Sequence, residues 1–287
     1  MRNKKIIYFG LVILLVITIV LGVIIIFERK QRELKVSFLD VGQGDAILIE
    51  SGEKQVLIDG GKNGKLLLER LGEEMPFWDR KIEAVIITHP DFDHYGGLID
   101  AFDFYQVENL IKTQAGSTAD AWRILDGKIS EEKSAVINST AGSVIKFPCG
   151  AELEIIYPMG NVPQETEDKN DSSIVARLKF GENEFLLTGD LSENGEWEIL
   201  NSGQDISADF LKVGHHGSKS STSDEFLKKV APKEAIISVG KNNYGHPTQE
   251  VLEKLKNSLV QIWRTDEDGT IECKCKNINS ECVCFGS

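Results

Sequence analysis

Positive charge is scarce in this 287-residue sequence, which has 32 lysines and arginines against 45 aspartates and glutamates. The formal net charge is −13, and it falls to −18 without residues 1–32, which carry six basic residues and one acidic residue. Such a surface repels phosphate backbones at long range and lacks the basic footprint of proteins that hold nucleic acid by charge. A nucleic-acid substrate would therefore have to be gripped locally.

Repeats of fixed period and low-complexity tracts are also missing, which argues against a repeat protein and against a disordered chain. The hydrophobic content of 41% over 287 residues is enough for one substantial domain or two small ones.

One long hydrophobic run stands at the start of the chain. Residues 6–27 are apolar apart from Thr18 and two glycines, carry no charge, and are numerous enough to cross a bilayer as a helix. A cleaved signal peptide would have a shorter apolar centre and a small-residue cleavage site, whereas this run ends in Phe27-Glu28-Arg29-Lys30. We therefore expect residues 1–33 to be an uncleaved, single-pass membrane anchor. Basic residues flank the run equally, so the sequence does not orient it.

Strand-like segments open each half of the remaining chain, and strands alternating with helices close each half. This order predicts one domain in which two sheets pack face to face with helices outside. A helix is expected over 96–104, a final hairpin over 260–275 through the turn at 266–269, and no element is assigned within 112–138. Ser223 and Thr248 are the expected caps of helices 224–230 and 249–256.

All five histidines fall in three short segments, THPDFDHYGG, KVGHHGS and YGHP. In the first, His89, Asp91, Asp93 and His94 lie within six residues after a buried strand. Imidazole nitrogen and carboxylate oxygen are ligands of Zn²⁺ and Mn²⁺, and such a cluster is hard to explain by packing alone. The plainer alternative makes Asp91 a turn residue and His94 a helix cap.

Two further segments could join this cluster. Asp190 ends the apolar strand of FLLTGD at a glycine bend, although a strand followed by Gly-Asp is more often a plain turn. His215 and His216 follow another apolar strand, and the pair is ambiguous between ligand, proton donor and surface loop.

Taken in order, DVGQGDAILIE, IDGG, THPDFDHYGG, LLTGD, LKVGHHGS and VGKNNYGHP resemble the metallo-β-lactamase superfamily. The closest resemblance is to its ComEC-like branch, the hydrolase domain of competence proteins, and it covers about residues 34–272. It implies an α/β fold, a four-layer αββα sandwich with metal ions at one sheet edge. The superfamily motif HxHxDH is present with Asp91 in place of its second histidine.

The resemblance implies two divalent metal ions, Zn²⁺ or Mn²⁺, as cofactors. One ion would be held by Asp93, His94 and His246, the other by His89 and Asp91, and Asp190 would bridge the two. The superfamily usually supplies a further histidine between the first cluster and the bridging aspartate. This chain has none there, and Asn170 or Asp171 takes roughly that place. The loss of nitrogen ligands favours Mn²⁺, whereas the general order of affinities favours Zn²⁺, so the metal is left open.

The expected chemistry is hydrolysis of a phosphodiester, in which paired cations activate water and stabilise developing charge. By similarity to nuclease relatives, His215 or His216 would protonate the leaving oxygen or contact the phosphate, and Lys212 would be an extra cation. The resemblance implies an extracytoplasmic domain at the cell membrane that degrades a DNA strand in competence. One alternative is a cell-wall esterase similar to phosphorylcholine esterases of teichoic acids, and another is a metal-stabilised binding module without turnover.

The chain ends in a cysteine-rich tail, residues 273–287. Cys273 and Cys275 are followed after six residues by Cys282 and Cys284, and residues two apart on a strand point to one face. A hairpin turning near 277–280 would bring the four sulfurs together as two disulfides or as a four-thiolate zinc site. Strand spacing splays the sulfurs more than CxxC turns do, which favours disulfides.

Overall fold

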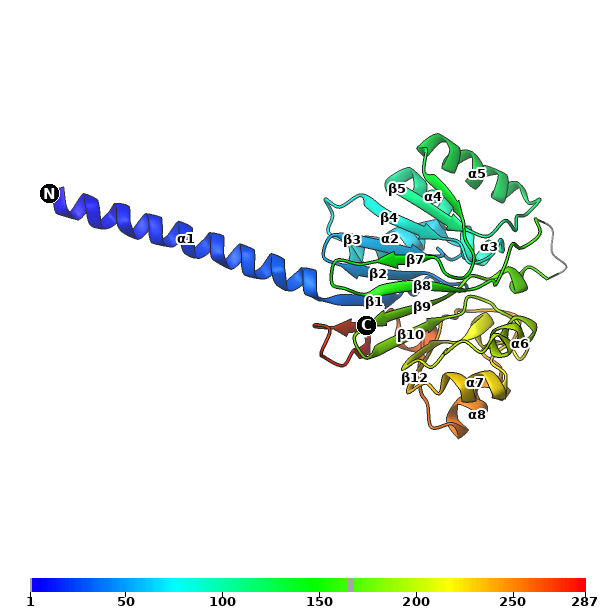
Figure 1. The fold of residues 1–287 in the computed structure, drawn as a ribbon. Coiled ribbons are helices and arrows are strands. Elements are labelled where there is room, and N and C mark those ends of the chain that lie inside the picture. The colour runs from blue at the N-terminus through cyan, green and yellow to red at the C-terminus, as the bar shows by residue number, and fades with distance from the viewer. Residues whose placement is uncertain (1, 165–167) are drawn as a thin grey trace.

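Two β-sheets packed face to face form the centre of the molecule in a computed structural model that describes residues 2–164 and 168–287 (Figure 1). The first sheet has eight strands in the order β15-β14-β1-β2-β3-β4-β5-β6. Their bounds are β1 Leu34–Phe38, β2 Ile47–Ser51, β3 Lys54–Ile58, β4 Lys81–Ile86, β5 Gln106–Lys112, β6 Ala135–Asn138, β14 Ile271–Cys275 and β15 Val283–Gly286.

The second sheet has seven strands in the order β13-β12-β11-β10-β9-β8-β7. Their bounds are β7 Val144–Lys146, β8 Glu152–Tyr157, β9 Val175–Phe180, β10 Asn183–Leu187, β11 Phe210–Lys212, β12 Glu234–Ile237 and β13 Gln261–Arg264. The helices are α1 Arg2–Arg32, α2 Gly64–Glu74, α3 Phe92–Tyr95, α4 Leu98–Phe104, α5 Asp120–Glu132, α6 Glu193–Ser202, α7 Asp224–Val230, α8 Gln249–Asn257 and α9 Thr265–Asp268, with 3₁₀ turns at Asn170–Ser172 and Gly214–Gly217.

Three buried apolar clusters hold four layers together. One lies between the sheets and includes Val36 and Phe185. A second joins the outer face of the first sheet to α2, α4 and α5, with Leu71 as a member. The third joins the second sheet to α6, α7 and α8 through residues such as Leu255. The predicted two-sheet α/β architecture with outer helices is therefore confirmed.

Helix caps follow the local sequence. The Ser223 hydroxyl accepts the N–H of Phe226, and the Thr248 hydroxyl accepts the N–H of Val251. Both predicted caps are confirmed, because a serine or threonine oxygen satisfies an N–H group that the first turn leaves unpaired. The helix expected over 96–104 is α4, which begins two residues later at Leu98, and the short helix α3 precedes it. The region 112–138, which had no assignment, contains α5 and β6.

The hairpin predicted over 260–275 is wrong. β13 pairs in parallel with β12 in the second sheet, whereas β14 pairs with β1 in the first. The acidic segment expected to be its turn is α9, which carries the chain from one sheet to the other. Local turn propensity could not reveal this, because the partner strands lie far away in the sequence.

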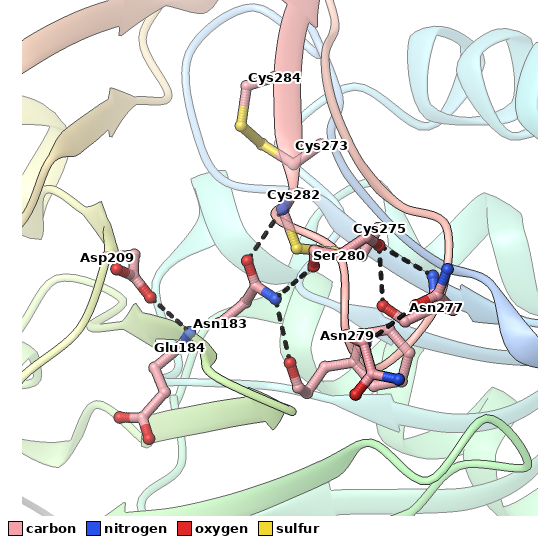
Figure 2. The surroundings of a disulfide bond; sticks show 11 residues. Asn183, Glu184, Asp209, Cys273, Cys275, Asn277, Asn279, Ser280, Cys282 and Cys284 are labelled. Atoms are coloured by element: carbon pink, nitrogen blue, oxygen red, sulfur yellow. Dashed lines mark hydrogen bonds between the residues drawn. A yellow bond between two sulfur atoms is a disulfide. The ribbon is translucent and has the colours of Figure 1, made fainter.

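The cysteine tail forms the hairpin β14–β15, which adds two strands to the edge of the first sheet beside β1. β14 begins at Ile271, so the hairpin spans the boundary expected between 272 and 273. Disulfides join Cys273 to Cys284 and Cys275 to Cys282, and all four cysteines are buried within the cluster between the sheets. Asn183 on β10 donates to the Ser280 carbonyl at 2.9 Å and accepts the Cys282 N–H at 2.8 Å (Figure 2).

α1 contains the apolar run of residues 6–27 and leaves the sandwich at the end where β1 begins (Figure 1). Counting only the residues that the structure describes, no helix has the length and apolar character needed to cross a membrane.

Candidate metal centre

Polar side chains follow four strands at one edge of the sandwich. β3 and β4 are parallel in the first sheet, and β10 and β11 are parallel in the second. Asp59 follows β3, His89 follows β4, Asp190 follows β10 and His216 follows β11. Because carboxyl ends of parallel strands meet at one edge, groups far apart in sequence converge there. This is the convergence that the sequence predicted for the histidine and aspartate segments.

Asp59 orients the HPDFDH turn. Its carboxylate accepts the Thr88 N–H at 2.8 Å and the Thr88 hydroxyl at 2.6 Å, and lies 2.8 Å from Nδ1 of His94. With Nδ1 engaged, Nε2 of His94 faces Asp190 at 3.2 Å. A carboxylate that fixes the outer nitrogen of a histidine while the inner nitrogen stays available is typical of metal sites.

His216 is fixed in the same manner from the second sheet. Its Nδ1 lies 2.8 Å from the Ser238 carbonyl, and its Nε2 lies 3.3 Å from Asp190 and 3.5 Å from Asp93. His215 and His216 have φ of 47° and 53°, in the left-handed region that non-glycine residues rarely adopt. Such strain is found at functional sites, and here it places both rings beside Asp190.

Lys212 has a different place from the one expected. Its side chain is fully buried, and its Nζ lies 2.8 Å from Asp45 and 2.9 Å from the Val213 carbonyl. Asp45 in turn lies 3.4 Å from Nδ1 of His216. The expectation of a cation that contacts substrate is therefore corrected: Lys212 neutralises Asp45, and that pair supports His216.

The donor atoms fit a divalent metal. Nε2 of His89, His94 and His216 and Oδ1 of Asp190 are buried and find no hydrogen-bond partner among the described residues. Buried polar atoms without partners are costly unless a further group satisfies them. Neutral imidazoles and carboxylates are the donor set of Zn²⁺ and Mn²⁺ sites. The described groups whose ligand atoms lie within 4.8 Å of one another are His89–His94–Asp190, Asp93–His94–His216, Asp45–Asp190–His216 and Asp45–Asp59–His94.

Three predicted site residues lie at the margin of this cluster. His215 Nε2 is 3.8 Å from Asp190, and its ring centroid is 5.4 Å from that of His246. His246 has a buried Nδ1 without a partner in the described part of the chain. Asp91 lies 3.8 Å from Nε2 of His89 and pairs with Lys169 at 2.9 Å. None of the three belongs to the groups named above, considering the described residues.

The place of the missing histidine is filled differently. Asp171 accepts from the Ser192 hydroxyl, so its carboxylate holds the start of α6. Lys169 of the same loop reaches Asp91 instead. Sequence reasoning also passed over Asp45 and Asp59 as site residues. Both lie in quoted motifs, DVGQGDAILIE and IDGG, and a carboxylate beside glycine next to a strand was the available signal.

The ionisation states of the cluster diverge. Burial, followed by repulsion from His94, lowers the pKa of His89 to about 3, so this ring is neutral. Burial opposes charge on His94 and His216 as well, but the Asp190 carboxylate beside them raises both pKa values well above the usual range. The same contacts overcome burial at Asp190 and hold its pKa well below the usual range. The metal-free centre therefore retains protons that bound cations would displace.

The fold and this centre define a protein of the metallo-β-lactamase superfamily of hydrolases. The model of that superfamily matches residues 39–113 and 141–241, which is more than half of the chain, and the chain belongs to this family.

The predicted ComEC-like branch is confirmed by curated relatives. The chain is 34% identical over 276 residues to ComE operon protein 3 of Bacillus subtilis, covering 90% of this chain and 35% of that protein. It is 32% identical over 255 residues to Recombination protein 2 of Haemophilus influenzae, covering 86% and 30%. The chain thus spans about a third of the length of these relatives. The metallo-β-lactamase fold protein YhfI of Bacillus subtilis has a TM-score of 0.53 at 14% identity, covering 82% and 97%, and shares the fold.

Proposed function

We propose that this chain is a metal-dependent phosphodiesterase that hydrolyses nucleic acid. The observation that carries the proposal is the convergence, at one edge of the sandwich, of buried ligand atoms from His89, His94, His216 and Asp190 that have no hydrogen-bond partner among the described residues. Relatives called competence and recombination proteins support a nucleic-acid substrate.

Two cations fit the geometry better in a slightly different ligand set from the one the sequence suggested. His89, His94 and Asp190 would hold one ion, because their ligand atoms lie within 4.8 Å of one another. Asp93 and His216 would hold the other, and Asp190 would face both, since Nε2 of His216 lies 3.5 Å from Asp93 and 3.3 Å from Asp190. Bound divalent ions would lower the pKa of a water molecule and neutralise charge on a phosphodiester. His246 and Asp91 remain candidate ligands at the margin.

His215 is the better candidate for the proton donor. Its side chain is 26% exposed, whereas that of His216 is 2% exposed and lies against Ser238 and Asp190. A general acid must reach the leaving oxygen of a bound substrate, so it has to be open to the solvent side of the centre. His215, beside Asp190, meets this requirement while Lys212 does not.

The test is hydrolysis by the full chain in detergent with Mn²⁺ or Zn²⁺. Substrates are single-stranded DNA, double-stranded DNA, a chromogenic phosphodiester and a phosphorylcholine ester. We expect Asp93→Ala to lower turnover about 100-fold, since even the loss of a group that only orients a metal ligand costs about 10- to 100-fold. Asp120→Ala, a change at a side chain 88% exposed, is the matched control and keeps full activity.

Three results would contradict the proposal. Turnover unchanged by Asp93→Ala would remove the metal mechanism. Metal binding with no hydrolysis of any ester would identify a binding module. Hydrolysis confined to the phosphorylcholine ester would identify a cell-wall esterase.

We also propose that the N-terminal segment attaches the protein to a membrane, with the catalytic domain outside the cytoplasm. The uncharged apolar sequence of residues 6–27 supports attachment. Large apolar side chains along α1, among them Leu11, Leu14 and Ile17, are about half exposed or more in the isolated chain, and contiguous exposed apolar side chains mark interaction surfaces. Two disulfides support an oxidising compartment.

A further inference from the structure

Two aromatic side chains are exposed beside the metal centre. Phe92 lies between Asp91 and Asp93 in the turn after β4, and its side chain is 50% exposed. Tyr244 lies two residues before His246 in the segment after β12, and it is 75% exposed. The two rings therefore come from different sheets, and the ligand cluster lies where those sheets meet.

Each ring is supported on one side and open on another. The Phe92 ring meets the buried Tyr95 ring edge-on, with centroids 5.6 Å apart. The Tyr244 ring is tilted by 31° to His246 at 5.8 Å. Large apolar rings left in water have an energetic cost that neighbouring packing does not remove here. Rings held in this way can stack on a flat aromatic ligand.

The segment that carries Tyr244 is well ordered by its own hydrogen bonds. The Asn242 side-chain oxygen accepts the N–H groups of Tyr244, Gly245 and His246 at 3.0, 3.0 and 3.1 Å. The Asn242 amide nitrogen donates to the His246 carbonyl at 2.8 Å. Tyr244 is thus presented next to His246 by a closed turn, which lowers the entropic cost of binding a ligand.

The negative charge of the chain gives such rings a role in binding nucleic acid. With a net charge of −13 and carboxylates at Asp91 and Asp93, the chain offers a strand little long-range attraction for its phosphates. Stacking of bases on aromatic side chains does not depend on this attraction and tolerates any base sequence. Bases in a duplex are already stacked and paired, so only a single strand offers free faces.

We propose that Phe92 and Tyr244 stack on bases next to the scissile phosphodiester, which makes single-stranded nucleic acid the substrate class of this centre. This inference rests on the proposed phosphodiesterase function and deepens it. It also explains how an acidic protein could retain a polyanionic substrate near its metal ions.

The test compares two labelled strands of equal length, one with bases and one abasic, both with hydrolysis-resistant phosphorothioate linkages. Affinity is measured by fluorescence anisotropy with the full chain and Mn²⁺. We expect the wild type to prefer the strand with bases about 5- to 150-fold per stacked base. Tyr244→Ala and Phe92→Ala should each reduce that preference. Tyr244→Phe, which keeps the ring, and Trp197→Ala, which removes a 46% exposed ring on α6, should retain it.

A preference unchanged in both alanine variants would overturn the inference. So would competition by choline that is lost in Tyr244→Ala, because the rings would then bind a quaternary ammonium group. The hydrolysis assay is separate from this measurement. If the wild type prefers the strand with bases but hydrolyses no substrate, only the catalytic proposal is refuted. If the wild type hydrolyses DNA but has no preference for the strand with bases, only the stacking proposal is refuted.

Discussion

At the scale of single residues, the buried ion pair of Lys212 and Asp45 predicts how substitutions there change the free energy of unfolding. Both side chains are buried, and their charges lie 2.8 Å apart. Lys212→Met should lower the free energy of unfolding by about 3–5 kcal/mol, because it leaves the Asp45 charge buried without its partner. The double variant Lys212→Met with Asp45→Leu should recover much of that loss, since no lone charge remains. Urea unfolding with a chelator present measures both, and equal stability of the single and double variants would contradict the explanation.

The raised pKa values of His94 and His216 predict how metal binding depends on pH. In the metal-free chain at neutral pH both rings are protonated on both nitrogens, and a cation must displace one of these two protons. Affinity for Mn²⁺ should therefore rise with pH and fall as the solution becomes more acidic. Calorimetry in buffers of different ionisation enthalpy should detect proton release on binding. Binding without release at neutral pH would show that the rings are already neutral.

Single residues also show what a sequence can and cannot predict about a site. The spacing in HPDFDH and the glycine after Thr188 indicated His89, His94 and Asp190 as candidate site residues, because these signals are local. The proposed place of His216 among the inner ligands, with His246 at the margin, depends on the pairing of β11 with β12, which brings Ser238 beside the His216 ring. Nothing in either histidine segment encodes that contact.

At the scale of elements, the hairpin β14–β15 is stabilised by its two cross-strand disulfides (Figure 2). Replacing Cys273 and Cys284 by serine should lower stability by about 2–3 kcal/mol, because the bridge closes a loop of 11 residues in the unfolded chain. Cys149→Ser is the control, since Cys149 forms no disulfide. Thermal unfolding under oxidising conditions measures the change. A melting temperature that is equally lowered in the control would trace the effect to packing of sulfur.

Elements with local signals were predicted better than those without. α7 begins after a serine cap and α8 after a threonine cap, so both starts are readable in the sequence. α6 was missed although Ser192 caps it, because its sequence has few apolar residues to give a helical period. The parting of β13 from β14 was missed because sheet membership depends on distant partners.

At the scale of the whole molecule, the proposed attachment predicts where the protein resides. The full chain should float with liposomes in a density gradient, because the segment 6–27 is uncharged and apolar. A variant with Leu14→Lys and Ile17→Lys should stay with the soluble fraction or aggregate less, since buried charges in lipid are costly. The paired control, Phe77→Lys with Trp78→Lys, changes two exposed apolar residues outside α1 and should still float. Wild-type protein that remains at the bottom of the gradient would contradict attachment.

The polarity of the strands gives the molecule two opposite ends. β1, β3 and β4 run in the same direction, so α1 joins the sandwich at one end and the candidate metal centre lies at the other, about 20 Å away for strands of five or six residues. Figure 1 shows α1 and α3 at these opposite ends. An enzyme attached to a membrane through α1 would hold its metal centre away from the lipid headgroups. Polymeric substrates would reach the centre from the surrounding solution, and products could diffuse away without passing along the membrane surface.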